Sequence, residues 1–146
     1  MLRGNYRATV DGKGRLKIPT AFKSFLDENY GQDFFVTSMD GQSARIYPFP
    51  VWHRYEEKLA ALPSMNKFKK RFLDRTNYWG QMAHADAQGR ILIPSLLRES
   101  AAIREKVAVL GYLDYLEVWD MDRFREHLER EPFTEDDQQA LSELGI

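Results

Sequence analysis

An aspartate and an arginine stand four residues apart at two places in this sequence, each time with a glycine directly before the arginine. The first copy is DGKGRLKIPT, from Asp11 to Thr20, and the second is DAQGRILIPS, from Asp86 to Ser95. A guanidinium can donate two parallel hydrogen bonds to a carboxylate, to a phosphate or to the edge of a guanine base. Each arginine could therefore pair with its own aspartate or bind an anionic partner such as DNA.

The first copy carries more positive charge than the second. Lys13 and Lys17 flank Arg15, whereas a glutamine and a leucine occupy the matching positions around Arg90. Because successive side chains of a strand alternate between its two faces, Arg15 and Lys17 are expected on one face. Arg3 lies upstream and adds to this basic cluster. We therefore predict DNA contacts from Arg15 first, then from Lys13, with Arg3 and Lys17 in support.

The aspartates and the glycines of the two motifs are expected to have structural roles. Asp11 and Asp86 can accept backbone N–H groups within their own turns, and Gly14 and Gly89 can adopt the positive φ that such turns require. A carboxylate repels phosphate, so Asp11 is not expected to contact DNA. Arg90 is expected to form an ion pair with Asp86. This interpretation makes the first copy the DNA-facing one and the second mainly a scaffold or an assembly surface.

The sequence shows no arrangement typical of an enzyme or of a metal site. It contains no cysteine, and its three histidines, His53, His84 and His127, lie in different predicted elements without metal-ligand spacing. The segment Gly12–Arg15 is too short for a phosphate-binding loop and leads into a strand rather than a helix. We therefore expect no enzymatic activity, no metal and no cofactor.

Positive and negative charges are separated along the chain. The net charge of the 146 residues is −1, but residues 1–75 hold 14 Lys and Arg against 8 Asp and Glu, and residues 76–146 hold 7 against 14. This asymmetry favours an anionic partner for the first half, or head-to-tail association of copies of the chain. No segment approaches the roughly 18 apolar residues of a membrane-spanning helix, and the start is unlike a secretion signal. We expect a cytoplasmic protein with no membrane partner.

The two motifs lie inside two longer repeats. When Asp11 is aligned with Asp86 and the later segments are shifted by two or three residues, FFVTSM matches VAVLGY and ARIYPFPVW matches LEVWDMDRF. Each repeat predicts a strand, a glycine turn, a second strand, a short helix, two more strands and an amphipathic helix. The first two strands, residues 6–10 and 15–18, are expected to pair as a hairpin. Because one repeat has few strands and little core, the two copies are expected to pack around a shared core.

The two repeats divide the chain into four predicted segments. We predict a first repeat at residues 1–62, a connecting helix at 63–80, a second repeat at 81–131 and an acidic helix at 132–146. The connecting helix carries the basic run Lys67–Arg75, interpreted as a solvated face or a partner for the acidic second half, with direct DNA contact as the alternative. The expected fold class is α+β, mainly β, with the two repeats forming one pseudo-symmetric domain.

With these features the sequence resembles the MraZ family of bacterial regulators. The resemblance covers nearly the whole chain and rests on the paired Asp-x-x-Gly-Arg motifs, the opening LRG, the segments YPFPVW and LPSMN, and QGRILIP followed later by LEVWD. It implies tandem AbrB-like (SpoVT-AbrB) swapped-hairpin repeats and a ring-like homo-oligomer. It further implies a transcriptional regulator that binds short repeated promoter boxes upstream of its own operon of cell-wall and division genes. DNA contacts would come from the Asp-x-x-Gly-Arg region, and the protein would be associated with the nucleoid.

Two other functions fit the sequence. One is a ring-shaped scaffold that holds other proteins without reading a DNA sequence. The other is an AbrB-like antitoxin, a class that usually has one such unit followed by an unstructured toxin-binding tail. Both units are complete here and the segment after them is short, which argues against an antitoxin.

Overall fold

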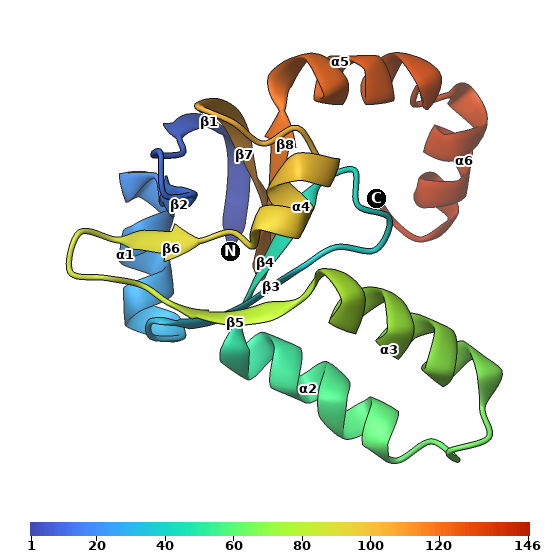
Figure 1. Ribbon diagram of the computed structural model, residues 1–146. Helices are drawn as coiled ribbons and strands as arrows, with labels where there is room; N and C mark the ends of the chain where they lie inside the picture. Colours follow the sequence, from blue (N-terminus) through green and yellow to red (C-terminus); the bar gives the residue numbers. More distant parts are fainter.

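A six-stranded antiparallel sheet forms the centre of the fold (Figure 1). The computed structural model describes residues 1–146. The strands lie in the order β1-β7-β8-β4-β3-β5, with the bounds Leu2–Thr9 (β1), Lys106–Leu113 (β7), Tyr115–Asp120 (β8), Ala44–Pro48 (β4), Asp33–Thr37 (β3) and Gln81–His84 (β5). A second, two-stranded sheet pairs β2 (Arg15–Lys17) with β6 (Arg90–Leu92), and we call it the β2–β6 ribbon.

Six helices surround the two sheets. They are α1 (Thr20–Asn29), α2 (Phe49–Ala60), α3 (Lys67–Trp79), α4 (Ser95–Ser100), α5 (Met121–Arg130) and α6 (Glu135–Glu143). The ribbon, α1 and α4 cover one face of the large sheet, and α2, α3 and α5 lie against the other. None of the six has the length and apolar character needed to cross a bilayer. The predicted α+β class with a dominant sheet is confirmed.

The two repeats exchange strands. β1 pairs along its whole length with β7, and β5 pairs with β3. The prediction that residues 6–10 and 15–18 form a hairpin is therefore wrong, because these segments meet only at the bridge between Val10 and Leu16. β2 pairs instead with β6, since this arrangement buries the apolar side chains of both repeats together. The exchange agrees with the swapped arrangement that the family resemblance implies.

One hydrophobic core serves both repeats. Leu16 and Ile91 lie opposite each other in the ribbon, and both are fully buried. They belong to a cluster of 20 buried residues that also includes Phe34, Val107 and Leu97. Burying one such side chain stabilises the fold by about 1.5–3 kcal/mol, so each repeat alone would lose a large part of this contribution. The boundaries predicted for the four segments do not enclose separate cores and stay predictions.

The large sheet is symmetric about a line between β4 and β8. Reading outward from this line gives β4, β3 and β5 on one side and β8, β7 and β1 on the other, which are equivalent strands of the two repeats. The ribbon obeys the same symmetry, because β2 and β6 are equivalent strands paired with each other. The two Asp-x-x-Gly-Arg motifs, distant in the sequence, are therefore placed side by side.

Candidate nucleic-acid interface

Each Asp-x-x-Gly-Arg motif forms a tight turn that is closed by its aspartate. Oδ1 of Asp11 accepts the backbone N–H groups of Lys13 (3.0 Å) and Arg15 (2.9 Å). Oδ1 of Asp86 accepts the equivalent two groups of the second turn, both at 2.9 Å. Aspartate suits this position because its short side chain reaches the backbone of the residues that follow it.

The glycine of each turn is held by a helix of the other repeat. Gly14 and Gly89 adopt positive φ values of 84° and 72°, a conformation that other residues rarely adopt. A Cβ atom at Gly14 would lie 2.3 Å from Cζ of Arg98 in α4, and one at Gly89 would lie 2.7 Å from Cε of Lys23 in α1. Each turn therefore takes its final position only when the other repeat is folded against it.

The four charged side chains of the motifs form one cluster, which we call the Asp–Arg quartet: Asp11, Arg15, Asp86 and Arg90. Nε of Arg15 donates to Oδ2 of Asp11 at 2.8 Å. Nε of Arg90 donates to Oδ2 of Asp86 at 2.9 Å. Nη1 of each arginine also faces the aspartate of the other repeat, at 3.9 Å for Arg15 and 3.7 Å for Arg90. Both arginines thus have equivalent ion-pair partners, and each donates its side-chain hydrogen bond through Nε.

The quartet makes the stability of the protein sensitive to acid. The backbone N–H of Arg15 holds the pKa of Asp11 below its ordinary value of 3.8, and that of Arg90 does the same for Asp86. A carboxyl whose pKa is lower in the folded state stabilises the fold above pH 3.8, and this contribution is lost as the pH falls through the lower, folded value. We expect wild type to be more stable than Asp11→Asn/Asp86→Asn at pH 7, and the difference to shrink below about pH 4.

Urea denaturation of both proteins from pH 7 down to pH 2.5 measures this difference. Asparagine keeps the Oδ1 acceptor of the turn, removes the charge and replaces the second oxygen with an NH2 group, which cannot accept from the arginine. A stability difference that stays constant down to the lowest pH would contradict an ionic role for the quartet.

Strand pairing places a lysine beside the second arginine of the quartet. Lys17 lies directly opposite Arg90 in the ribbon, while Leu92 lies opposite Arg15. Lys13 precedes Arg15 in the first turn and is exposed. Because the residues between them along the strands are buried, these basic side chains share the outward face of the ribbon. From the sequence, both lysines were expected beside Arg15. The position of Lys17 opposite Arg90 was not predictable, because pairing between strands of different repeats leaves no local sequence pattern.

Arg3 does not join this surface within one chain. It lies in β1 opposite Tyr112 of β7, beside the buried Leu2. Six extended residues separate it from Val10, which bridges to β2, and they correspond to roughly 20 Å. The support of Arg3 for DNA binding stays a prediction, and it requires DNA that extends well beyond the ribbon.

The outward face of the ribbon combines charge with fixed donors. The quartet is neutral as a whole, so Lys13 and Lys17 supply the net positive charge that attracts an anion. The arginines supply guanidinium groups whose planes are held by carboxylates. A two-stranded ribbon of this kind fits the major groove of B-DNA, where bases present their hydrogen-bonding edges. Positive charge and fixed hydrogen-bond donors on one face are features that a nucleic-acid interface requires.

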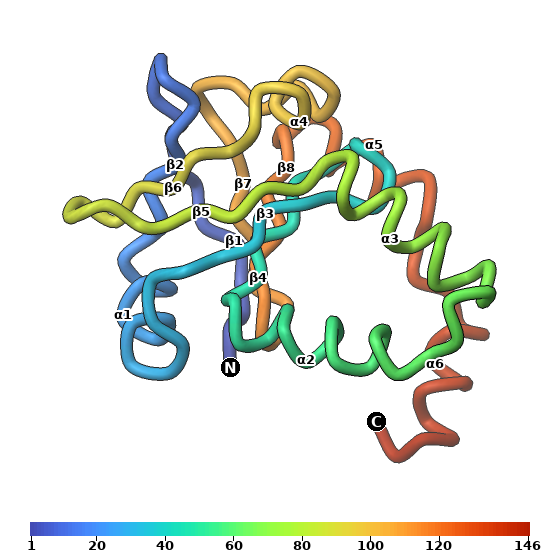
Figure 2. Tube along the Cα trace, turned by 60° about the horizontal axis from the view of Figure 1, so that its bottom comes forward, coloured from blue at the N-terminus to red at the C-terminus, as the bar shows by residue number.

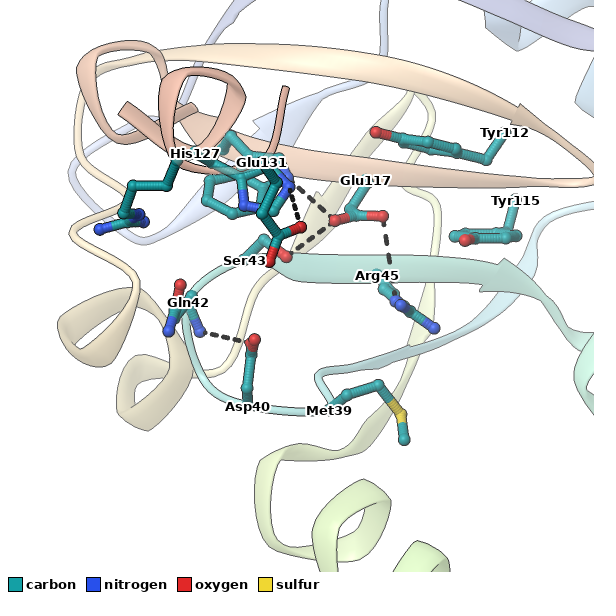
Figure 3. Close-up of a pocket in the computed structure, with 12 residues that line it drawn as sticks. Met39, Asp40, Gln42, Ser43, Arg45, Tyr112, Tyr115, Glu117, His127 and Glu131 are labelled. Carbon is teal, nitrogen blue, oxygen red and sulfur yellow. Dashed lines mark hydrogen bonds and ion pairs between the residues drawn. The ribbon is translucent and has the colours of Figure 1, made fainter. Parts of the chain in front are cut away.

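A separate polar pocket of about 460 Å³ lies on the opposite face of the large sheet (Figure 3). Oε1 of the buried Glu117 accepts hydrogen bonds from Oγ of Ser43 (3.0 Å) and Nε1 of Trp119 (2.9 Å). Oε2 of Glu117 faces Nε of Arg45 at 3.9 Å. The contacts of Glu117 with Ser43 and Arg45 join β8 to β4 and the residue before it, and sequence patterns gave no sign of them because these residues are far apart in the chain. No group of three His, Asp or Glu side chains is placed to hold a metal ion.

Comparison with known proteins finds relatives that match this chain over its whole length. Residues 1–75 and 81–144 match the family model of the MraZ protein, whose description compares it with antitoxins. The chain is 52% identical over 146 residues to the transcriptional regulator MraZ of Acidobacterium capsulatum, with 100% of both chains covered. It is 47% identical over 147 residues to that of Koribacter versatilis and 33% identical over 147 residues to that of Halothermothrix orenii, again with 100% of both chains covered.

Each of the two segments that match the family model contains one Asp-x-x-Gly-Arg motif, two residues of the quartet and one strand of the ribbon. The repeats inferred from the sequence are therefore the repeats of the family. The match covers nearly the whole chain, and full-length relatives exceed 30% identity. The chain belongs to the MraZ family.

Proposed function

We propose that the chain is a sequence-specific DNA-binding transcriptional regulator that reads double-stranded promoter DNA through the outward face of the β2–β6 ribbon. The observation that carries this proposal is the pair of oriented arginines, Arg15 and Arg90, with Lys17 paired opposite Arg90. The relatives described above are named transcriptional regulators, which supports the same class of function.

Lysines and arginines have different roles in this proposal. Lys13 and Lys17 contact phosphates, because an ammonium is a compact charge with freely rotating donors. Arg15 and Arg90 reach base edges in the major groove, where guanine presents O6 and N7 as acceptors. The aspartates hold the guanidinium planes before DNA arrives, so less conformational entropy is lost on binding.

One ribbon is too small to define a promoter. Its three residues per strand span about 10 Å, the length of about three base pairs. A ring-like homo-oligomer would place several ribbons on repeated boxes, and each bound ribbon would raise the effective concentration of the next. We place these boxes upstream of the chain's own operon of cell-wall and division genes, as the family resemblance implies. The protein then acts at the nucleoid in the cytoplasm, without catalysis or a cofactor.

The ordered segment after the second repeat supports a regulator over an antitoxin. An AbrB-like antitoxin is expected to carry an unstructured tail, whereas residues 135–143 form α6. The hydroxyl of Thr134 accepts the backbone N–H of Asp137 at 3.2 Å, and the carboxylate of Asp137 accepts the backbone N–H of Thr134 at 2.9 Å. This reciprocal cap fixes the start of the helix.

Fluorescence anisotropy tests the proposal with DNA from upstream of the chain's own coding sequence, compared with a shuffled duplex of the same length at two salt concentrations. We expect tighter binding to the upstream duplex and a loss of affinity as salt rises, because bound lysines displace counterions. Lys17→Ala should weaken binding to both duplexes alike. It should also reduce the slope of log K against log salt by about one for each chain that contacts DNA.

Lys58→Ala is the matched control, because Lys58 is an exposed lysine of α2 on the other face of the large sheet. It should bind DNA as the wild type does. Equal binding of the upstream and shuffled duplexes would contradict sequence-specific readout and leave the scaffold as the better function. A Lys17→Ala salt slope equal to that of the wild type would remove the ribbon from the interface.

A further inference from the structure

Two helical arms of opposite charge extend from the face of the large sheet that lies away from the ribbon (Figures 1 and 2). We call residues 49–79, with α2 and α3, the basic arm, and residues 121–146, with α5 and α6, the acidic arm. Helix α3 holds five basic residues, Lys67, Lys69, Lys70, Arg71 and Arg75, against Asp74. The acidic arm holds three arginines against eight acidic residues: Asp122, Glu126, Glu129, Glu131, Glu135, Asp136, Asp137 and Glu143.

The basic arm presents an exposed stripe with the composition of a protein interface. Phe68, Arg71, Arg75 and Tyr78 follow one another at spacings of three and four residues, so they share one side of α3. Phe68 is 68% exposed and Tyr78 is 62% exposed. Arg71 and Arg75 form no ion pair within the chain, although Lys70 pairs with Asp74. Aromatic and arginine side chains dominate the binding energy of protein interfaces, so this stripe is suited to a protein partner.

In the acidic arm, the second helix does not bury side chains against the first as it does in the basic arm. In the first repeat, α3 folds back onto α2, and Phe72 stacks on Trp52 with ring centroids 6.0 Å apart. Helix α6 follows α5 as α3 follows α2, but no residue of α5 or α6 is buried. More than half of each of four large apolar side chains stays exposed on this arm: Leu128, Phe133, Leu144 and Ile146. The acidic arm therefore offers an apolar surface surrounded by negative charge.

We propose that the exposed stripe of α3 in one copy docks on the acidic arm of a second copy. Charge complementarity favours this occupant, because two arms of like charge repel each other and a basic arm attracts an acidic arm. This inference rests on the homo-oligomer of the proposed function and adds the surfaces that form it.

The two docking surfaces differ, so the contact is head-to-tail. Each copy offers its basic arm to one neighbour and receives the basic arm of another on its acidic arm. Such a contact continues from copy to copy, and it closes into a ring when the rotation between neighbours allows. Neither arm includes a residue of the ribbon, so every copy keeps its DNA-facing surface free.

A charge-reversal pair tests this arrangement. Variant A carries Arg71→Glu and Arg75→Glu, so that the exposed stripe of its α3 becomes negative. Variant B carries Glu129→Lys and Glu143→Lys, so that its acidic arm loses most of its net negative charge. Residues 129 and 143 lie at the C-terminal ends of α5 and α6, where a lysine is favourable to the helix dipole, and all four positions are exposed. Circular dichroism confirms that each variant is folded before its mass is measured.

Light scattering after size exclusion, without DNA, then gives the mass of each protein. We expect a wild-type assembly of several chains, a loss of mass toward the 17.1 kDa single chain for A alone and for B alone, and a return to the wild-type mass when A and B are mixed in equal amounts. Only head-to-tail docking of unlike arms predicts this rescue, because A and B can then alternate.

Three results would overturn the inference: A and B that keep the wild-type mass, a mixture that stays dissociated, or a wild type that is a single chain. The last result would also remove the oligomer from the proposed function. An assembly that behaves as expected but does not prefer the upstream duplex would leave the docking intact and refute the DNA-binding proposal alone.

Discussion

Arg15→Ala and Arg90→Ala should each weaken binding to the upstream duplex by about 5- to 150-fold, with comparable losses for the two variants. This range corresponds to the loss of about 1–3 kcal/mol that a specific arginine contact with a base contributes. The losses are expected to be comparable because each arginine is held by its own aspartate in an equivalent turn. Anisotropy titrations at one fixed salt concentration measure both losses.

Two controls separate charge from geometry in this experiment. Arg15→Lys keeps the positive charge but loses the planar fork, so it should bind the shuffled duplex nearly as the wild type does while losing preference for the upstream one. Arg54→Ala removes an exposed arginine of α2, which lies outside both the ribbon and the exposed stripe of α3, and should leave both affinities unchanged. Full affinity of Arg90→Ala would restrict the DNA surface to the first turn. Full affinity of both alanine variants would place the DNA interface outside the ribbon.

Gly111→Ala should destabilise the protein by about 3 kcal/mol, which lowers the melting temperature by about 6–12 °C. Gly111 lies in β7 opposite β1, and a Cβ atom there would come within 2.4 Å of the backbone nitrogen of Arg3 and 2.6 Å of the carbonyl carbon of Leu2. Backbone atoms cannot turn aside as the end of a side chain can. β1 would have to move away from β7, and the buried Leu2 would move with it.

Gly12→Ala is the matched control for Gly111→Ala. A Cβ atom at Gly12 would meet nothing within 4 Å, and the residue is not among those with positive φ. This variant should melt at or slightly above the wild-type temperature, because alanine lowers the entropy of the unfolded chain. Thermal denaturation followed by circular dichroism compares the three proteins. A Gly111→Ala protein that melts with the wild type would show that β1 is not closely held by β7.

Local sequence patterns predicted the elements of this fold but not their partners. The duplicated segments predicted the repeats, and the α+β class followed from them. Pairing of Lys17 with Arg90 across the ribbon was not predictable, because it joins residues of different repeats whose flanking sequences give no register. The hairpin expected for residues 6–10 and 15–18 failed for the same reason, since a glycine turn specifies a change of direction and not the strand that lies alongside.

The two turns of the candidate site were predictable from the sequence, but the ion pairs between the turns were not. The spacing of aspartate, glycine and arginine indicated a turn closed by a carboxylate, and Asp11 and Asp86 lie in such turns. The ion pairs that join the two turns depend on the symmetry of the whole fold. The contact of Glu117 with Ser43 was invisible for a related reason, because a buried carboxylate and its donor came together only when β8 paired with β4.

The exchange of strands sets an order of events during synthesis of the protein. When a ribosome has released β1 and β2, neither strand has its partner, since β1 pairs with residues 106–113 and β2 with residues 90–92. At about 5–20 residues per second, β1 waits on the order of ten seconds for β7. Pairings between such distant residues also form slowly once both strands exist. A nascent or truncated chain therefore has no assembled ribbon, and the surface proposed to bind DNA first exists when the second repeat is complete.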